Sequence, residues 1–475
     1  MSQKLKQTIS IIFLIIIILI LILGYLCINL HPSPDSNYYL SVSRHVLDGY
    51  TPTYNVDSGY TPFVYYILAG GLSLLGNTHV TAGIVLSFFH VLNIFLIYYV
   101  LKILFKISNK LNLVFIAFYI LALFKLSGYS LGLEPFQVFF ALVSIIFIAN
   151  KNNNIYSMIP AGIAMGISIM CKQYSALYAL GFFLWLLNDL LLNRSNFKRL
   201  FIKGLFFGLS TTIPYLLFVI LTKATLIGSL TQFGIFGNLI TNYVTDKPLL
   251  YQTGLKNIIK VVGIHSFELL PFILYPLYKF QNKISKEIVP HADLIFIIGL
   301  MSSLSFLIRQ YSHYFQLILP FSIILWAIIL TSYSIKNNSK INKWITIIAV
   351  VISISNIAYF SPKLAYYKYK AEIKNKSSYY VKLANESLGV FKTGSTLYVR
   401  SNSSLYAFCN YRNPLLNYDF VSPQIMFNNG GVPEPIKNVI IPKFPEDEYN
   451  KDKKFFLNNG FSVLEDNKYG LYLFR

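Results

Sequence analysis

Long apolar runs alternate with short polar segments along this chain, which is the pattern of a protein that crosses a membrane many times. Eleven runs stand out, at about residues 8–30, 80–101, 111–129, 134–149, 155–170, 174–192, 201–221, 258–278, 294–308, 314–331 and 344–360. A helix needs roughly 20 apolar residues to span the hydrocarbon, so the shorter runs predict bent or partly immersed helices. No small-residue cleavage site follows the first run, so we expect it to be retained as an anchor.

The basic residues indicate how the chain is threaded. With Lys4 and Lys6 on the inside, the inner loops collect most of the Lys and Arg of the membrane region, as cytoplasmic loops do. An odd number of spans then puts the N-terminus in the cytoplasm and the C-terminus outside. The high Asn, Lys and Ile content, without a eukaryotic retention signal, favours the plasma (inner) membrane of a bacterium.

Two segments differ from this pattern. The first outer loop, at residues 31–79, begins with HPSPDSNYYLSVSRHVLDGY, where the Pro-Asp-Ser triplet predicts the start of a surface helix. The later stretch PFVYYILAGGLSLLG is short for a span and predicts an interfacial helix.

The second segment is the tail at residues 361–475, which is rich in Lys, Asn and Tyr. There LYVR and NVIIPK predict strands, DEYNKDKKFFLNNG a helix closed by Gly460, and FSVLEDNKYGLYLFR a hairpin. We therefore predict an α-helical polytopic membrane protein with about eleven spans in residues 1–360. A small extracytoplasmic α/β domain follows.

Composition supports a membrane protein and removes other classes. Hydrophobic residues make up 55% of the chain and charged residues only 12%, far from a soluble domain. The net charge of +21 is spread over the inner loops and the tail, so it predicts contact with lipid headgroups rather than with nucleic acid. The three cysteines have no metal-like spacing.

The first loop resembles a known family. Asp35 with Tyr38 and Tyr39, then GYTP and TPF leading into YYILAGGLSLLG, resemble the first periplasmic loop of GT-C membrane glycosyltransferases. The nearest group includes the aminoarabinose transferase of lipid A and the protein O-mannosyltransferases. Two later stretches, AGIAMGISIMCKQY and RQYSHYFQLILP, stand in the same order as in that family. The resemblance covers residues 35–320.

This resemblance implies a sugar donor carried on a polyprenyl phosphate and an inverting transfer to an acceptor hydroxyl of an envelope glycan, lipid or protein. It also implies that Asp35 is the catalytic base. A hydroxyl attacks only when its proton is removed, and a positioned carboxylate is typically worth 10²- to 10⁴-fold in rate. The alternative is that Asp35 only caps the surface helix by accepting from its free N–H groups.

Glu134 is the second acidic candidate, because relatives bring an acidic residue from this loop toward the first loop. There it would bind a metal or orient the acceptor; the alternative is a helix-start Glu stabilised by the helix dipole. No cofactor is certain, and the metal is unknown, with Asp35 and Glu134 as candidates for holding a divalent ion.

Several further side chains are candidates for binding the donor phosphate, since an ionisable group at membrane depth usually serves an ion, substrate or partner. They are Arg309, His313, Lys172 and Arg44, with the nearby hydroxyls of Tyr39 and Tyr311. The alternative for the arginines is snorkelling to lipid headgroups. The sequence departs from aminoarabinose transferases at Tyr60-Thr61-Pro62, where relatives carry a basic residue before the proline.

Two other function classes remain open. An envelope polysaccharide polymerase or ligase also spans the membrane many times, but it relies on Arg and His in a late large outer loop. A transporter requires polar residues at mid-membrane and repeat symmetry, and the sequence shows neither. The sugar and the acceptor cannot be deduced from one sequence, because a few polar contacts in a cavity choose them.

Overall fold

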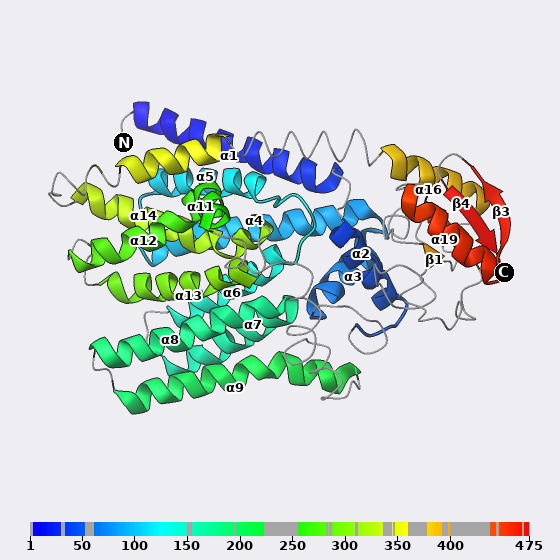
Figure 1. The fold of residues 1–475 in the computed structure, drawn as a ribbon. Coiled ribbons are helices and arrows are strands. Elements are labelled where there is room, and N and C mark those ends of the chain that lie inside the picture. The colour runs from blue at the N-terminus through cyan, green and yellow to red at the C-terminus, as the bar shows by residue number, and fades with distance from the viewer. Residues whose placement is uncertain are drawn as a thin grey trace. The chain divides into compact units, whose positions relative to one another are not determined.

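The computed structural model describes a largely helical protein with one small sheet (Figure 1). It describes residues 3–29, 34–52, 61–149, 154–193, 196–222, 255–281, 284, 287–308, 312–335, 344, 347–359, 378–391, 398–399, 438–442, 446–467 and 470–474. The chain divides into two compact units. The membrane unit comprises Met1–Cys27 and Leu86–Tyr366, and the loop unit comprises Ile28–Val85 and Tyr367–Arg475.

The apolar runs form helices close to the predicted positions, except that the run at residues 258–278 is divided into two helices at His265. The helices are α1 (Gln3–Asn29), α4 (His79–Ile103), α5 (Asn109–Lys125), α6 (Glu134–Ile148), α7 (Met158–Cys171), α8 (Ala176–Asn193), α9 (Phe197–Thr222), α11 (Leu255–Ile264), α12 (Ser266–Phe280), α13 (Val289–Ile308) and α14 (Leu319–Ile335). Short 3-10 helices η1 (Ile155–Ser157), η2 (Gln173–Ser175) and η4 (Ser312–Leu317) precede α7, α8 and α14. A last apolar helix covers Ile347–Tyr359.

Four of the described helices are long and apolar enough to cross a membrane: Ser10–Ile28, His79–Ile103, Gln173–Leu191 and Phe197–Thr222. Shorter apolar helices lie at Phe63–Leu75, Glu134–Ile148, Ile155–Cys171, Val289–Ser305, Leu319–Ser332 and Ile347–Tyr359. Several runs thus form helices below the length of a straight span, as predicted. The count of eleven spans stays a prediction.

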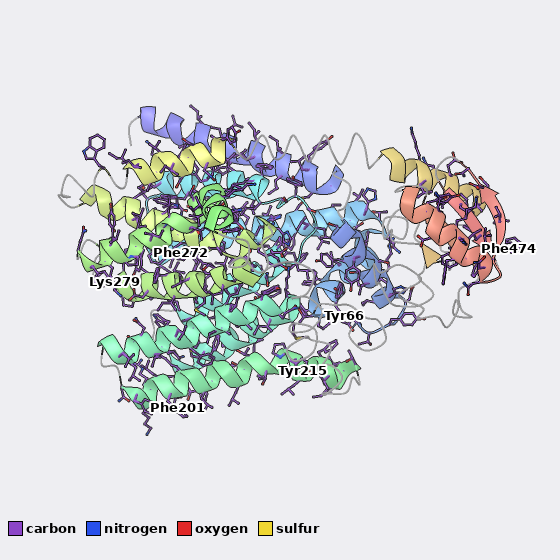
Figure 2. The ribbon with its side chains drawn as sticks, viewed as in Figure 1. Tyr66, Phe201, Tyr215, Phe272, Lys279 and Phe474 are labelled. Atoms are coloured by element: carbon purple, nitrogen blue, oxygen red, sulfur yellow. The ribbon has the colours of Figure 1, made fainter. Side chains whose placement is uncertain are left out.

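The membrane unit carries its apolar side chains outward as well as inward. On α9, Phe201 is 59% exposed and projects away from the neighbouring helices (Figure 2). In water such an apolar face would be costly, but a bilayer solvates it. This burial pattern agrees with a protein embedded in lipid.

Glycines set the closest helix packing in the membrane unit. Helix α7 packs between α6 and α9 (Figure 1). A Cβ atom on Gly162 would collide with Ser210 and the carbonyl of Phe207, and one on Gly166 with the carbonyl of Thr211. These glycines are four residues apart, on one face of α7, which is the small-residue spacing that lets membrane helices approach closely.

A proline in α12 determines how that helix meets α14. Pro271 has no N–H, so the carbonyl of Phe267 loses its partner within the helix. The indole Nε1 of Trp326 on α14 donates to this carbonyl at 3.0 Å. One residue along, Ser322 Oγ donates to the carbonyl of Glu268 at 2.6 Å. The two helices are therefore joined where the backbone is locally incomplete.

In the loop unit, the predicted surface helix is α2 (Pro34–Leu47) and the predicted interfacial helix is α3 (Phe63–Leu75). The two helices pack on each other. The apolar side of α2 supplies Tyr39 and Val42, both buried. Close packing continues at Gly71, where a Cβ would lie 2.5 Å from a methyl group of Val85.

The tail forms the small α/β module that the sequence predicted. Its elements are α16 (Ser378–Val390), β1 (Tyr398–Val399), β2 (Asn438–Pro442), α19 (Glu446–Asn458), β3 (Ser462–Asp466) and β4 (Gly470–Phe474). The sheet has the order β1-β2-β4-β3, with β1 parallel to β2 and the other pairs antiparallel. Gly460 ends α19 with φ at +84°, which glycine adopts at low cost.

Candidate functional site

The membrane unit contains a buried ion pair at the edges of α6 and α7. Glu134 begins α6, and Lys172 follows the last residue of α7 in an extended conformation. Lys172 Nζ donates to Glu134 Oε1 at 2.5 Å, and the two side chains are 2% and 1% exposed. Gly132 makes room for this carboxylate, because a Cβ there would collide with Glu134 Oε2.

Aromatic and imidazole rings surround the pair. Lys172 Nζ lies 4.4 Å from the ring centroid of Tyr314 and 5.6 Å from that of Tyr174, which is cation–π range. His313 Nε2 is 3.9 Å from Glu134 Oε1, and its side chain is 35% exposed. The cluster of Glu134, Lys172, His313, Tyr174 and Tyr314 is hereafter called the outer cluster, after the side of the membrane on which the sequence analysis expects it. It offers one carboxylate, one ammonium and one accessible imidazole within a dry frame.

A hydrogen-bond network fixes the frame one turn deeper. Ser168 Oγ lies within hydrogen-bond distance of two acceptors, the carbonyl of Gln137 at 2.7 Å and Ser175 Oγ at 2.8 Å. Ser175 Oγ in turn donates to Gln137 Oε1 at 2.8 Å. Because these three residues belong to α6, α7 and η2, the network holds the elements that carry Glu134 and Lys172 in register.

The candidates of the first loop lie on α2 of the loop unit. Asp35 is the second residue of this helix, at the N-terminal position that the sequence predicted. The structure describes its backbone but not its side chain. Tyr39 is 4% exposed, with its ring centroid 5.8 Å from Tyr38 and 6.4 Å from Tyr65. Its ring is therefore part of the packing between α2 and α3.

Arg44 is also buried, at 2% exposure. Its Nε donates to Asn77 Oδ1 at 2.6 Å, which ties α2 to the turn between α3 and α4. This hydrogen bond explains why the arginine can be buried inside the loop unit. It favours a structural role for Arg44, in which the side chain holds α2 against the turn after α3. Snorkelling to headgroups, the alternative raised for it, does not fit this burial.

Arg309 and Tyr311 lie outside the described residues, between the end of α13 at Ile308 and the start of η4 at Ser312. Among the described residues, no group of three or more His, Cys, Asp or Glu side chains gathers to hold a metal ion. The metal prediction that involves Asp35 is therefore untested.

The structure contains a second buried charged cluster that the sequence analysis missed. Lys125 Nζ donates to Glu268 Oε1 at 3.0 Å, to Glu268 Oε2 at 2.9 Å and to Asn356 Oδ1 at 2.7 Å. His265 Nδ1 lies 3.7 Å from Glu268 Oε2. Neither Lys125 nor Glu268 was among the candidate residues of the sequence analysis. The available signal was a carboxylate inside the apolar run SFELLPF, which requires a cation at membrane depth.

Comparisons with known proteins agree with this architecture. A family model described as dolichyl-phosphate-mannose-protein mannosyltransferase matches residues 59–218. No curated protein sequence matches the chain. Among solved structures, ArnT from Cupriavidus metallidurans, bound to undecaprenyl phosphate, aligns over 97% of this chain and 97% of that protein. The TM-score is 0.62 at 13% identity.

Two archaeal structures are similar over less of their own length. The oligosaccharyltransferase of Archaeoglobus fulgidus in its apo form aligns over 92% of this chain and 69% of that one, with a TM-score of 0.56 at 10% identity. AglB from the same organism, in complex with an inhibitory peptide and a dolichol-phosphate, aligns over 93% and 71%, again at 0.56 and 10%. The chain thus has the fold of ArnT and of the archaeal oligosaccharyltransferases, as the resemblance to GT-C membrane glycosyltransferases predicted. The match of the family model to residues 59–218 agrees with the expected likeness to the protein mannosyltransferases.

Proposed function

We propose that this protein is an inverting glycosyltransferase that moves a sugar from a polyprenyl-phosphate donor to an acceptor hydroxyl on the extracytoplasmic face. The acceptor is a glycan, lipid or protein of the cell envelope. The observation that carries the proposal is the outer cluster on a GT-C fold, where charged groups are buried at helix edges at a cost that function explains. Related proteins were solved with undecaprenyl phosphate and with dolichol-phosphate.

Asp35 is the proposed base. The transfer forms a bond between the acceptor oxygen and the sugar carbon while the bond from that carbon to the donor phosphate breaks. The acceptor proton passes to the carboxylate, and the polyprenyl phosphate leaves with the electron pair. Phosphate is already a competent leaving group, so it requires cations rather than an acid.

The outer cluster, with Arg309 and Tyr311 beside it in sequence, is the proposed donor site. His313 is its accessible member, whereas the charge of Lys172 is already paired with Glu134. A phosphate bound here would therefore meet His313 first. Glu134 would orient Lys172 and the acceptor rather than act as a second base.

The test uses membranes that contain the full chain and a labelled polyprenyl-phosphate sugar. Asp35→Asn should abolish transfer, because an amide cannot accept the acceptor proton, while expression and unfolding temperature stay near wild type. The matched control is Asp48→Asn, since Asp48 follows the end of the same helix and lies 3.9 Å from His45. If Asp35→Asn transfers sugar at the wild-type rate, the proposal is wrong.

The products also separate the alternatives. A transferase adds a fixed number of sugars to each acceptor, whereas a polymerase or ligase yields a ladder of chain lengths or transfers whole polymers. Movement of unmodified donor across the bilayer without transfer would indicate a transporter.

A further inference from the structure

The short helix η4 (Ser312–Leu317) lies between the two buried charged clusters. On one side, η4 supplies two members of the outer cluster: His313 Nε2 lies 3.9 Å from Glu134 Oε1, and the ring centroid of Tyr314 lies 4.4 Å from Lys172 Nζ. These contacts come from adjacent residues, so a small rotation of η4 would displace both.

On the other side, the next two residues of η4 contact the second cluster. The ring of Phe315 lies parallel to that of His265, with centroids 3.6 Å apart and planes 2° apart. Gln316 Nε2 donates to the carbonyl of Leu126, the residue after Lys125, at 3.0 Å. Phe315 and Gln316 are 1% and 4% exposed, so both contacts are dry.

The second cluster is built to be rigid. The side chains of Lys125 and Glu268 have no exposed surface. Two hydrogen bonds join them, whereas one joins Lys172 and Glu134. Asn356 Oδ1 accepts from the same ammonium, and its Nδ2 donates to the carbonyl of Gly263 at 2.9 Å. These bonds join α5, α11, α12 and the helix at Ile347–Tyr359. A buried charge pair tolerates little distortion, because any lost bond leaves a charge without solvation.

We infer that His265 is a positioning residue: supported by the Lys125–Glu268 pair, its ring holds Phe315 and so fixes the face of η4 that presents His313 to the outer cluster. The inference rests on the proposed function in one respect only, namely that this face of η4 is used in sugar transfer. The contacts themselves are independent of it. The second cluster then acts on the donor site through η4 without touching the substrate.

The alternative is that the second cluster only stabilises the helix bundle. Two variants of His265 separate these roles. His265→Phe keeps a flat ring for Phe315, whereas His265→Ala removes the ring, and both lose the polar contact with Glu268. If the polar contact with Glu268 only stabilised the bundle, the two variants would show the same labelling rate at position 313 and the same loss of activity.

The first measurement does not require activity. His313→Cys is made in a Cys409→Ser background, where Cys27 and Cys171 are buried, and the rate of maleimide labelling at position 313 is followed. Adding His265→Ala should change this rate several-fold, and adding His265→Phe should leave it near that of the parent. Equal rates for all three chains, or equal changes for both His265 variants, would overturn the inference.

The second measurement is donor kinetics in the chain with native His313. His265→Ala should lower kcat/KM for the donor by up to about 10²-fold, the effect of a misplacement near 1 Å, with the unfolding temperature unchanged. His265→Phe should retain most of the activity. Loss of activity in both variants in proportion to lost stability would contradict positioning. If neither wild type nor any variant transfers sugar, the proposed function fails, and the labelling result still decides the role of His265.

Discussion

Breaking the Glu134–Lys172 pair should destabilise the protein strongly, and unequally for the two partners. Both side chains are nearly inaccessible to solvent, and their charged atoms are 2.5 Å apart. Removing one partner of a buried pair leaves an uncompensated charge, which typically costs about 3–5 kcal/mol. Among the described side chains, Lys172→Met leaves His313, at 3.9 Å, as the remaining basic group beside the carboxylate, so we place its cost at the upper end.

Glu134→Gln should cost less, because the ammonium keeps the faces of Tyr314 and Tyr174. Cation–π contacts in a desolvated site contribute about 0.5–2 kcal/mol, which places this variant near about 3 kcal/mol. The double variant Glu134→Gln/Lys172→Met leaves no buried charge in the outer cluster. It should lie within about 1 kcal/mol of the wild type, since uncharged replacements of buried pairs are often neutral.

The assay is reversible unfolding of the four proteins in mixed detergent micelles, analysed as a double-mutant cycle. We expect a coupling energy of at least about 2 kcal/mol, as for residues in direct contact. Additive effects would refute the reasoning, because they would mean that the pair is not formed in the membrane. Sugar transfer is measured in parallel. The double variant should stay inactive despite its restored stability, and full activity there would reduce the pair to a structural element.

Three further perturbations test the packing and the tail. Gly166→Leu should force α7 away from α9 and cost at least about 1–3 kcal/mol, seen as a lower unfolding temperature, while an unchanged temperature would exclude the close approach. Trp326→Phe removes the donor to the carbonyl of Phe267 and should cost about 1–3 kcal/mol, with infrared spectra showing a freed carbonyl in α12. In the tail, the hydrogen bond with Asp466 raises the pKa of Lys453. The folded state therefore gains the full stability of this pair at pH values below the ordinary lysine pKa. It loses that stability as the pH rises through the raised pKa. The pair is partly exposed, so Lys453→Met should shift stability by less than about 1 kcal/mol at pH 7 and by nothing once the lysine is deprotonated.

The pairing of Glu134 with Lys172 changes how each residue of the outer cluster is interpreted. In sequence, Lys172 was a candidate phosphate ligand and Glu134 a candidate for binding a metal or orienting the acceptor, and each was judged alone. The structure joins them into one neutral pair, so neither acts independently of the other. His313, whose side chain is 35% exposed, is therefore the more accessible member of the outer cluster.

Periodicity and turn chemistry are local, and they were sufficient for the elements. The apolar runs, the helix that begins at Pro34, the short helix at Phe63–Leu75 and the hairpin of β3 and β4 all follow from residues close in sequence. Small departures also have local causes. The run at residues 111–129 ends its helix at Lys125, because Ser127 adopts a φ of +61° before Gly128.

The pairing of charges was decided by the tertiary structure alone. Lys125 and Glu268 are 143 residues apart, and Glu134 and Lys172 are 38 apart. Whether two such groups meet depends on the depth and rotation of each helix, which are set by contacts such as the glycines of α7 and the Trp326 bond to α12. The sequence shows which ionisable groups lie within the apolar runs. Because an unpaired charge in an apolar environment is costly in free energy, each of these groups is expected to have a partner there. Only the packed helices determine which partner it is.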